Sequence, residues 1–145
     1  MRRYETIFIL RPSQNEEEIN AIIDNTESII TADQGKIIEL DRWGMRKLAY
    51  PIKKEVQGFY VYIDYTSAPE AVSEIERKFR IDDSILRYMT VKTDDSLSPE
   101  ELQLAIDNVA AKNAVVEVAE ETTDIETDAA ENVETTVEES VDNKE

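Results

Sequence analysis

The side chains best suited to bind another molecule form a run of cations in the middle of the chain. Five of them fall within thirteen residues: Arg42, Arg46, Lys47, Lys53 and Lys54. Taken singly, each is explained equally well as a solvated surface charge. Taken together they are typical of a contact with phosphate groups, which lysine and arginine bind in nucleic acids. The formal net charge of the chain is −17, so this run predicts a phosphate-binding surface on an otherwise acidic protein.

Composition excludes several other kinds of chemistry. The sequence has no cysteine and no histidine, which rules out disulfides, thiolate zinc sites, cysteine nucleophiles and histidine-based triads. The apolar run near the start is short and ends at Arg11 and Pro12, so it suits neither a signal peptide nor a membrane span. We therefore predict a cytoplasmic protein that is not an enzyme and has no metal, no cofactor and no membrane partner.

The acidic charge is concentrated in the C-terminal third. Residues 1–96 contain 14 Lys and Arg against 18 Asp and Glu, a net charge of −4, whereas residues 97–145 contain 2 against 15, a net charge of −13. A short helix is possible over residues 98–112, and the Glu-, Thr- and Val-rich composition that follows predicts disorder. We expect a body of residues 1–96 and an acidic tail of residues 97–145. The tail is either a solubilising appendage or an electrostatic mimic that competes with nucleic acid for the basic surface.

The elements that must position the cations are predicted from hydrophobic periodicity and turn residues. Asn15 and Glu18 fit a capping box at the start of a helix, and Gly35 fits its end as a C′ glycine. Pro51 predicts that its strand ends or lies at a sheet edge. We expect strands over residues 3–10, from residue 36 into the basic run, from there to residue 66, and over 85–92, with helices after residues 15 and 68.

This order, β-α-β-β-α-β, predicts a ferredoxin-like α+β fold. In that fold a four-stranded antiparallel sheet carries two helices on one face. Right-handed crossovers place the first and third strands in the centre. The other face of the sheet is then left open.

Strand alternation predicts which side chains lie on that open face. In the last strand Arg87 and Met89 face it, whereas Leu86 and Tyr88 face the helices. Arg3 and Arg87 form its rim. The apolar and aromatic members are Ile7, Ile9, Tyr60, Tyr62, Met89 and Val91. Exposed apolar patches of this size usually bind a partner, although the 98–112 helix folding back would also cover them. Trp43 is expected to pack against its strand.

The chain resembles a known family over residues 1–93. The motifs are Met1–Glu5 (MRRYE), Trp43–Lys54 (WGMRKLAYPIKK), Gly58–Tyr60 (GFY) and Leu86–Met89 (LRYM). They are similar to those of the sixth protein of the bacterial small ribosomal subunit. The resemblance implies the fold just described and a structural role in the ribosome. It also implies binding to the central domain of 16S ribosomal RNA, as a heterodimer with small-subunit ribosomal protein eighteen.

The charge pattern and the family resemblance together predict which cations contact RNA and why RNA binding needs a protein partner. A body with a net charge of −4 has low RNA affinity by itself, and a partner that adds cations would compensate. No small-molecule substrate is expected. The predicted RNA contacts are Arg2, Arg3, Arg46, Lys47, Lys53, Lys54, Arg80 and Arg87.

Other proteins that share this strand order provide the alternatives. A small-molecule-binding regulatory domain is expected to have glycine in the loop after the first strand, where this chain has Arg11–Asn15 without one. An acylphosphatase-like enzyme would need a phosphate-cradling loop there. A single-strand RNA-recognition domain would have an aromatic signature flanked by glycines, which is missing.

Overall fold

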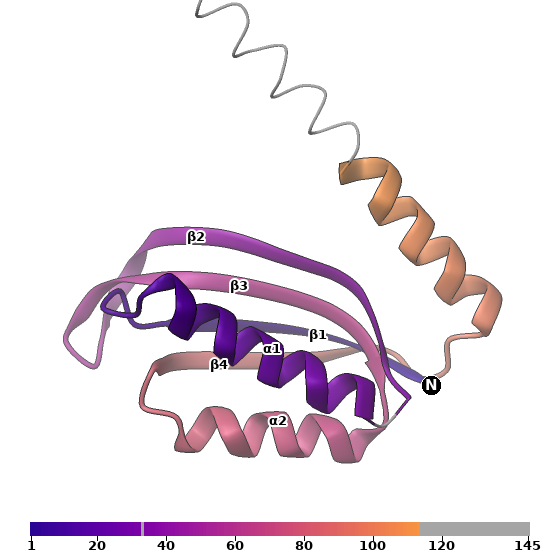
Figure 1. Ribbon diagram of the computed structural model, residues 1–145, viewed down its shortest axis with the longest axis horizontal. Coiled ribbons are helices and arrows are strands. Elements are labelled where there is room, and N and C mark those ends of the chain that lie inside the picture. The colour runs from indigo at the N-terminus through magenta and orange to yellow at the C-terminus, as the bar shows by residue number, and fades with distance from the viewer. Residues whose placement is uncertain (33, 114–145) are drawn as a thin grey trace, which may run out of the picture. The chain divides into compact units, whose positions relative to one another are not determined.

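The strands and helices follow one another in the predicted order. The structure is a computed structural model that describes residues 1–32 and 34–113. It contains β1 (Arg2–Leu10), α1 (Glu16–Ala32), β2 (Lys36–Ile52), β3 (Glu55–Ser67), α2 (Pro69–Ile81) and β4 (Ile85–Asp94). The strands form an antiparallel sheet in the order β2-β3-β1-β4, with β1 and β3 in the centre. Figure 1 shows the strands side by side with α1 in front of them. The predicted ferredoxin-like α+β fold is confirmed.

Helix α1 begins at the predicted capping box. The backbone N–H of Glu18 donates to Asn15 Oδ1 at 2.8 Å, and the backbone N–H of Asn15 donates to Glu18 Oε2 at 3.0 Å. These two bonds satisfy amide groups that have no partner within the helix. The apolar stripe of α1 then faces the sheet, with Ile19, Ile23 and Ile30 buried and Ile22 and Ile29 partly buried against the core.

The end of α1 differs in detail from the prediction. Gly35 does close the helix, since its backbone N–H donates to the carbonyl oxygen of Ile30 at 3.0 Å. The left-handed residue is Gln34, with φ 60°, rather than Gly35. Gly35 is needed because a Cβ atom there would lie 2.4 Å from the carbonyl oxygens of Ile30 and Thr66. The glycine therefore allows two backbone segments to approach closely.

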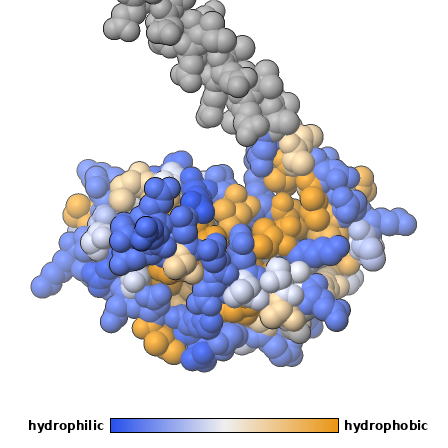
Figure 2. Space-filling model, viewed as in Figure 1, coloured by the Kyte–Doolittle hydropathy of each residue, from blue (hydrophilic) through white to orange (hydrophobic). Residues whose placement is uncertain are grey.

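The hydrophobic core lies between the helices and one face of the sheet. Helix α2 begins with Pro69 at its first turn, where the missing N–H has no consequence, and it buries Ile75 and Phe79. The ring of Phe79 packs 4.8 Å from that of Phe8 in β1. In Figure 2 hydrophilic side chains cover most of α1, and apolar side chains gather between α1 and the neighbouring strands β2 and β3. The sheet contributes Tyr4, Phe8, Leu10, Val61, Ile63, Tyr65 and Ile85 to this core.

Strand β2 is an irregular edge strand. Pro51 lies in it, near the end, so the prediction that this proline is at a sheet edge is confirmed. Its pairing with β3 shifts register three times, including between Arg42 and Gly44. Gly44 has φ 76°, which favours glycine. Such bulges bend a strand and change the direction of its side chains.

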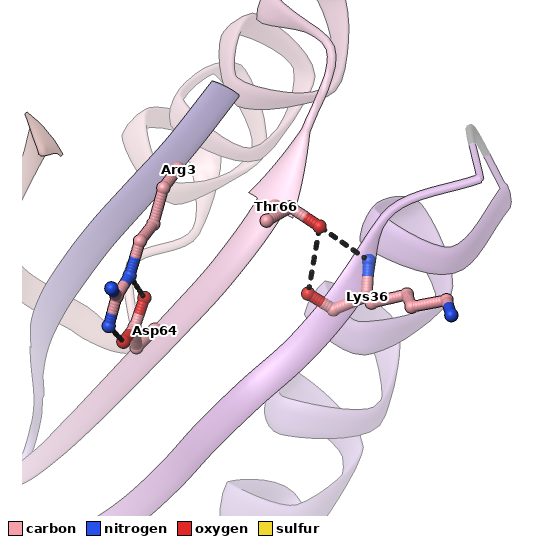
Figure 3. Close-up of polar contacts among 4 residues, drawn as sticks. All are labelled: Arg3, Lys36, Asp64 and Thr66. Atoms are coloured by element: carbon pink, nitrogen blue, oxygen red, sulfur yellow. Dashed lines mark hydrogen bonds and ion pairs between the residues drawn. The ribbon is translucent and has the colours of Figure 1, made fainter. Parts of the chain in front are cut away.

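Two polar contacts connect the end of β3 with the starts of β1 and β2 (Figure 3). The guanidinium of Arg3 donates to both carboxylate oxygens of Asp64, at 3.0 and 2.5 Å. The hydroxyl of Thr66 accepts the backbone N–H of Lys36 at 3.3 Å and donates to its carbonyl oxygen at 3.5 Å. Asp64 is only 2% exposed, so Arg3 neutralises a buried carboxylate.

The chain continues past the sheet into a further helix. The backbone N–H of Leu97 donates to the carbonyl oxygen of Met1 at 2.8 Å. Residues 99–113 are helical, after a second capping box in which Ser98 and Glu101 exchange hydrogen bonds of 2.9 and 3.2 Å. The first compact unit covers Met1–Ile106. The disorder predicted after about Asn113 falls on residues outside those that the structure describes.

Candidate interaction site

The open face of the sheet presents the predicted apolar side chains in two rows. In one row Ile7 of β1 lies between Tyr62 of β3 and Met89 of β4. In the next row Ile9 lies between Tyr60 and Arg87. Met89 and Val91 are 58% and 45% exposed, whereas Ile7, Tyr60 and Tyr62 are partly buried and Ile9 is buried. A partner would therefore meet the β4 side of this face first.

Ile9 is buried by a second, smaller apolar cluster. It packs with Leu48 of β2 and Leu86 of β4, and Ile52 and Tyr60 lie against these three. The prediction that Leu86 faces the helices is wrong. A register shift between Ile9 and Leu10 interrupts the alternation of β4 at this point, so Ile85 enters the main core and Leu86 enters the second cluster.

Four residues of this cluster, all but Leu86, line an apolar hollow on the open face. Its volume is about 320 Å³, and we call it the apolar hollow. Sequence reasoning identified the sheet residues but missed the contribution of β2. The apolar sequence LAYPI before the basic turn was the available signal. The hollow is lined by Ile7, Ile9, Leu48, Ala49, Tyr50, Ile52, Tyr60, Arg87, Tyr88 and Met89.

Aromatic side chains build a second feature of the open face. Trp43 stacks on Tyr62 with ring centroids 5.8 Å apart and an interplanar angle of 9°, and on Tyr60 at 6.4 Å and 18°. The indole N–H donates to Asp41 Oδ2 at 2.9 Å, and the guanidinium of Arg46 lies 5.8 Å from the ring centre. Trp43 thus packs on its neighbours as predicted, and one of the predicted RNA contacts lies over its ring.

The charge of the open face changes sign along the strands. Near the start of β1, Glu5 is paired in register with Asp64, which is paired in turn with Glu39. Burial raises the pKa of Tyr62 to about 12, and the carboxylates of Asp64, Glu5 and Glu39 add to the increase. This end of the face carries these three carboxylates, and Arg3 forms an ion pair with Asp64. The opposite end carries Arg46 and Arg87.

The structure brings together three of the eight predicted RNA contacts. Lys53, Arg80 and Arg87 surround a second hollow of about 230 Å³, which we call the basic hollow. Lys47 and Lys54 are exposed elsewhere on β2 and its turn, and Arg2 is exposed at the start of β1. In the sequence Arg80 is 27 residues from Lys53, and only the folded chain brings them to one place.

Within residues 1–32 and 34–113, no group of three or more acidic side chains could hold a metal ion. No helix in this part of the chain has the length and hydropathy that crossing a membrane requires. An exposed apolar hollow beside unpaired cations is typical of proteins that bind other macromolecules.

The fold and this site define a ferredoxin-like α+β protein whose open sheet face carries an apolar hollow and exposed cations. The family model for ribosomal protein S6 matches residues 3–92, which is most of the body. The chain belongs to the ribosomal protein S6 family, whose members are components of the small ribosomal subunit. The resemblance seen in the sequence is confirmed.

Individual relatives agree with this assignment. The small ribosomal subunit protein bS6 of Desulfotalea psychrophila is 52% identical over 122 residues, covering 83% of this chain and 77% of the relative. The protein of the same name from Caldanaerobacter subterraneus is 45% identical over 95 residues, covering 66% of this chain and 100% of the relative. The crystal structure of 30S ribosomal protein S6 from Thermotoga maritima is similar with a TM-score of 0.59 and 36% identity, covering 63% of this chain and 86% of the other.

Proposed function

We propose that this protein is a structural component of the small subunit that binds the central domain of 16S ribosomal RNA as a heterodimer with small-subunit ribosomal protein eighteen. The observation that carries the proposal is the apolar hollow on the open sheet face. A half-exposed apolar site of about 320 Å³, with Met89 58% exposed at its edge, is costly to leave in water. The proposal assigns the protein no enzymatic activity and no small-molecule substrate, in agreement with relatives that are ribosomal proteins.

The charge distribution explains why RNA binding should need the partner. The body has a net charge of −4, so long-range repulsion opposes its approach to RNA. A cationic partner relieves this repulsion and also suits the end of the open face around Glu5. Its apolar side chains would fill the hollow at the other end. The two ends together would fix the direction in which the partner lies across the strands.

The RNA contacts proposed from the sequence divide into two groups. Arg3 is already committed to Asp64, and removing it would leave a buried carboxylate without its cation. Its main role in the proposal is therefore to hold β1 and β3 together. The others are exposed and form no ion pair within the described chain, so their charges are available to phosphate groups: Arg2, Arg46, Lys47, Lys53, Lys54, Arg80 and Arg87.

The docking site is tested by changing Met89 to Asp. A carboxylate at the edge of the apolar hollow must lose water when the partner docks, so we expect affinity for protein eighteen to fall by about tenfold or more. Met89 is exposed, so the isolated variant should keep its melting temperature. Isothermal titration with purified protein eighteen measures the affinity. RNA binding by the pair should fall in parallel.

The matched control is Ile81→Asp. Ile81 is 66% exposed at the end of α2, away from the open face, and this change should leave the heterodimer intact. Equal affinities for Met89→Asp and the unmodified chain would show that the partner docks elsewhere. Tight RNA binding by the isolated protein at physiological salt would also refute the need for a partner.

A further inference from the structure

The basic hollow is built from three separate elements. Lys53 comes from the turn between β2 and β3, Arg80 from the last turn of α2 and Arg87 from β4. Its lining also includes two aromatic residues, Phe79 and Tyr88. Ile85 and Leu86 of β4 complete it. Its volume of about 230 Å³ is large enough for a phosphate group with part of a sugar.

No carboxylate neutralises this hollow. Its lining residues include no Asp or Glu, and none of the ion pairs found in the described chain involves Lys53, Arg80 or Arg87. Two of the acidic residues near them in sequence have other partners. Glu55 pairs with Arg11 at 3.4 Å, and Asp82 accepts the backbone N–H of Ser84 at 2.9 Å.

Two of the cations are held in place by neutral acceptors. Lys53 Nζ donates to the carbonyl oxygen of Ile85 at 3.0 Å, and a guanidinium N–H of Arg87 donates to the hydroxyl of Tyr50. Neither bond removes positive charge, and both leave further N–H groups free to donate. The cations are thus positioned in advance without being neutralised, as an anion site requires.

The turn that carries Lys53 adopts a backbone conformation that lysine disfavours. Ile52 and Glu55 are paired across a two-residue turn, in which Lys53 has φ 47° and Lys54 has φ 70°. Turns of this kind favour Asn-Gly, because both central residues are left-handed. Residues in such strained conformations are often found at functional sites.

We propose that the basic hollow binds a single phosphodiester group of the ribosomal RNA, which Lys53, Arg80 and Arg87 contact together. This inference rests on the proposed function for the identity of the RNA, but not for the existence of the anion site. Two guanidinium groups and an ammonium group that line one hollow match the several acceptor oxygens of one phosphate.

The number of phosphates bound is measurable from salt dependence. We expect the double variant Lys53→Gln/Arg80→Gln, in the heterodimer, to bind a 16S central-domain fragment about tenfold more weakly. The slope of log affinity against log salt should decrease by about 0.7–0.9, the value for one phosphate contact. The control Lys36→Gln removes an exposed cation at the far end of β2 and should change neither quantity. An unchanged slope, or a decrease of twice that size, would overturn the shared site.

The anion site is also testable without RNA or partner. Inorganic phosphate titrated into the full chain should shift the amide resonances of Ile85–Arg87 and the side-chain Nε–H signals of Arg80 and Arg87, with saturation. Arg80→Gln should abolish saturation, whereas Lys36→Gln should not. Saturable phosphate binding with no RNA binding by the unmodified pair would refute the proposed function while retaining the anion site. Shifts that are unaffected by Arg80→Gln would refute the site itself.

Discussion

Tyr65 carries its hydroxyl group into the main core. The residue is fully buried, and its hydroxyl lies 3.1 Å from that of Thr6, which in turn lies 3.1 Å from the hydroxyl of Thr90. Its ring stacks on that of Tyr4 with centroids 6.0 Å apart. This short chain of hydroxyl groups crosses three strands, so a polar network connects β3, β1 and β4 inside an otherwise apolar core.

The buried phenol makes stability depend on alkaline pH. Burial raises the pKa of Tyr65 to about 12, above its value of about 10 in an unfolded chain. The folded state therefore keeps a proton that the unfolded state loses. The stabilisation is complete below about pH 10 and is lost as the pH rises toward 12. Tyr62 contributes in the same direction.

We therefore expect Tyr65→Phe to flatten this decline. At pH 7 the variant should lose about 1 kcal/mol of unfolding free energy, because the hydrogen bond to Thr6 is removed. Between pH 10 and 12 its unfolding free energy should fall less steeply than that of the unmodified chain. Urea denaturation at a series of pH values measures both effects. A decline as steep as in the unmodified chain would show that another group is responsible.

At the scale of elements, the turn between β2 and β3 combines two demands. Its left-handed backbone suits small or polar residues, whereas its position beside the basic hollow suits cations. At Lys53 the backbone conformation disfavours lysine, whereas the basic hollow favours a cation, which also donates to the carbonyl oxygen of Ile85. The two demands do not conflict at Lys54, which lies outside the lining of that hollow.

Lys54→Gly tests the backbone strain of the turn separately from the charge of the basic hollow. Glycine adopts positive φ without strain, so we expect the unfolding free energy to rise by about 1 kcal/mol, with RNA binding weakened only by the loss of one exposed cation. Adding Lys53→Asn should maintain the stability and weaken RNA binding by the heterodimer. Thermal melts and filter binding measure the two properties. No gain in stability from Lys54→Gly would mean that the turn is not strained.

The sequence predicts this fold well where the signal is local. The capping box at Asn15 and the stripe of isoleucines in α1 depend on residues three and four apart, and both are present. Alternation also placed Tyr62 and Met89 on one face. It failed at Leu86, because the register shift that redirects this residue depends on how β1 pairs with β4.

The same limit applies to the site. A cluster of cations in the sequence was visible in Arg42–Lys54, but the basic hollow takes only Lys53 from it and adds Arg80 and Arg87. Nothing local in the sequence connects these three residues. The contribution of β2 to the apolar hollow was missed for a similar reason. Three register shifts in its pairing with β3 interrupt the alternation of its side chains between the two faces of the sheet.

At the scale of the whole molecule, most of the net negative charge lies in a part of the sequence that contains none of the proposed RNA contacts. Residues 114–145 hold twelve acidic residues and one lysine, so a chain that ends at Asn113 has a net charge of −6 instead of −17. Charge of this size repels RNA over a distance set by the salt concentration, about 10 Å at 0.1 M.

Removing residues 114–145 should therefore speed RNA association more than it changes stability. We expect the association rate of the heterodimer to rise by about two- to tenfold at low salt, with the difference vanishing at high salt. The melting transition should shift by less than about 1 kcal/mol. Stopped-flow mixing measures the rates. As a control, a full-length chain with neutral Gln or Asn at the twelve acidic positions should behave like the truncated one. Equal rates at all salt concentrations would favour a purely solubilising role.

Arg87 and Tyr88 line both the apolar hollow and the basic hollow. A protein partner in the first and an RNA phosphate in the second, as proposed, would contact the same two side chains, so the two binding events would be thermodynamically linked. Such linkage is reciprocal: the factor by which the protein partner tightens RNA is the factor by which RNA tightens the protein partner. If the proposed sites are correct, assembly would reach the same cooperative gain whether the protein partner or the RNA binds first, because two adjacent residues of β4 line both sites.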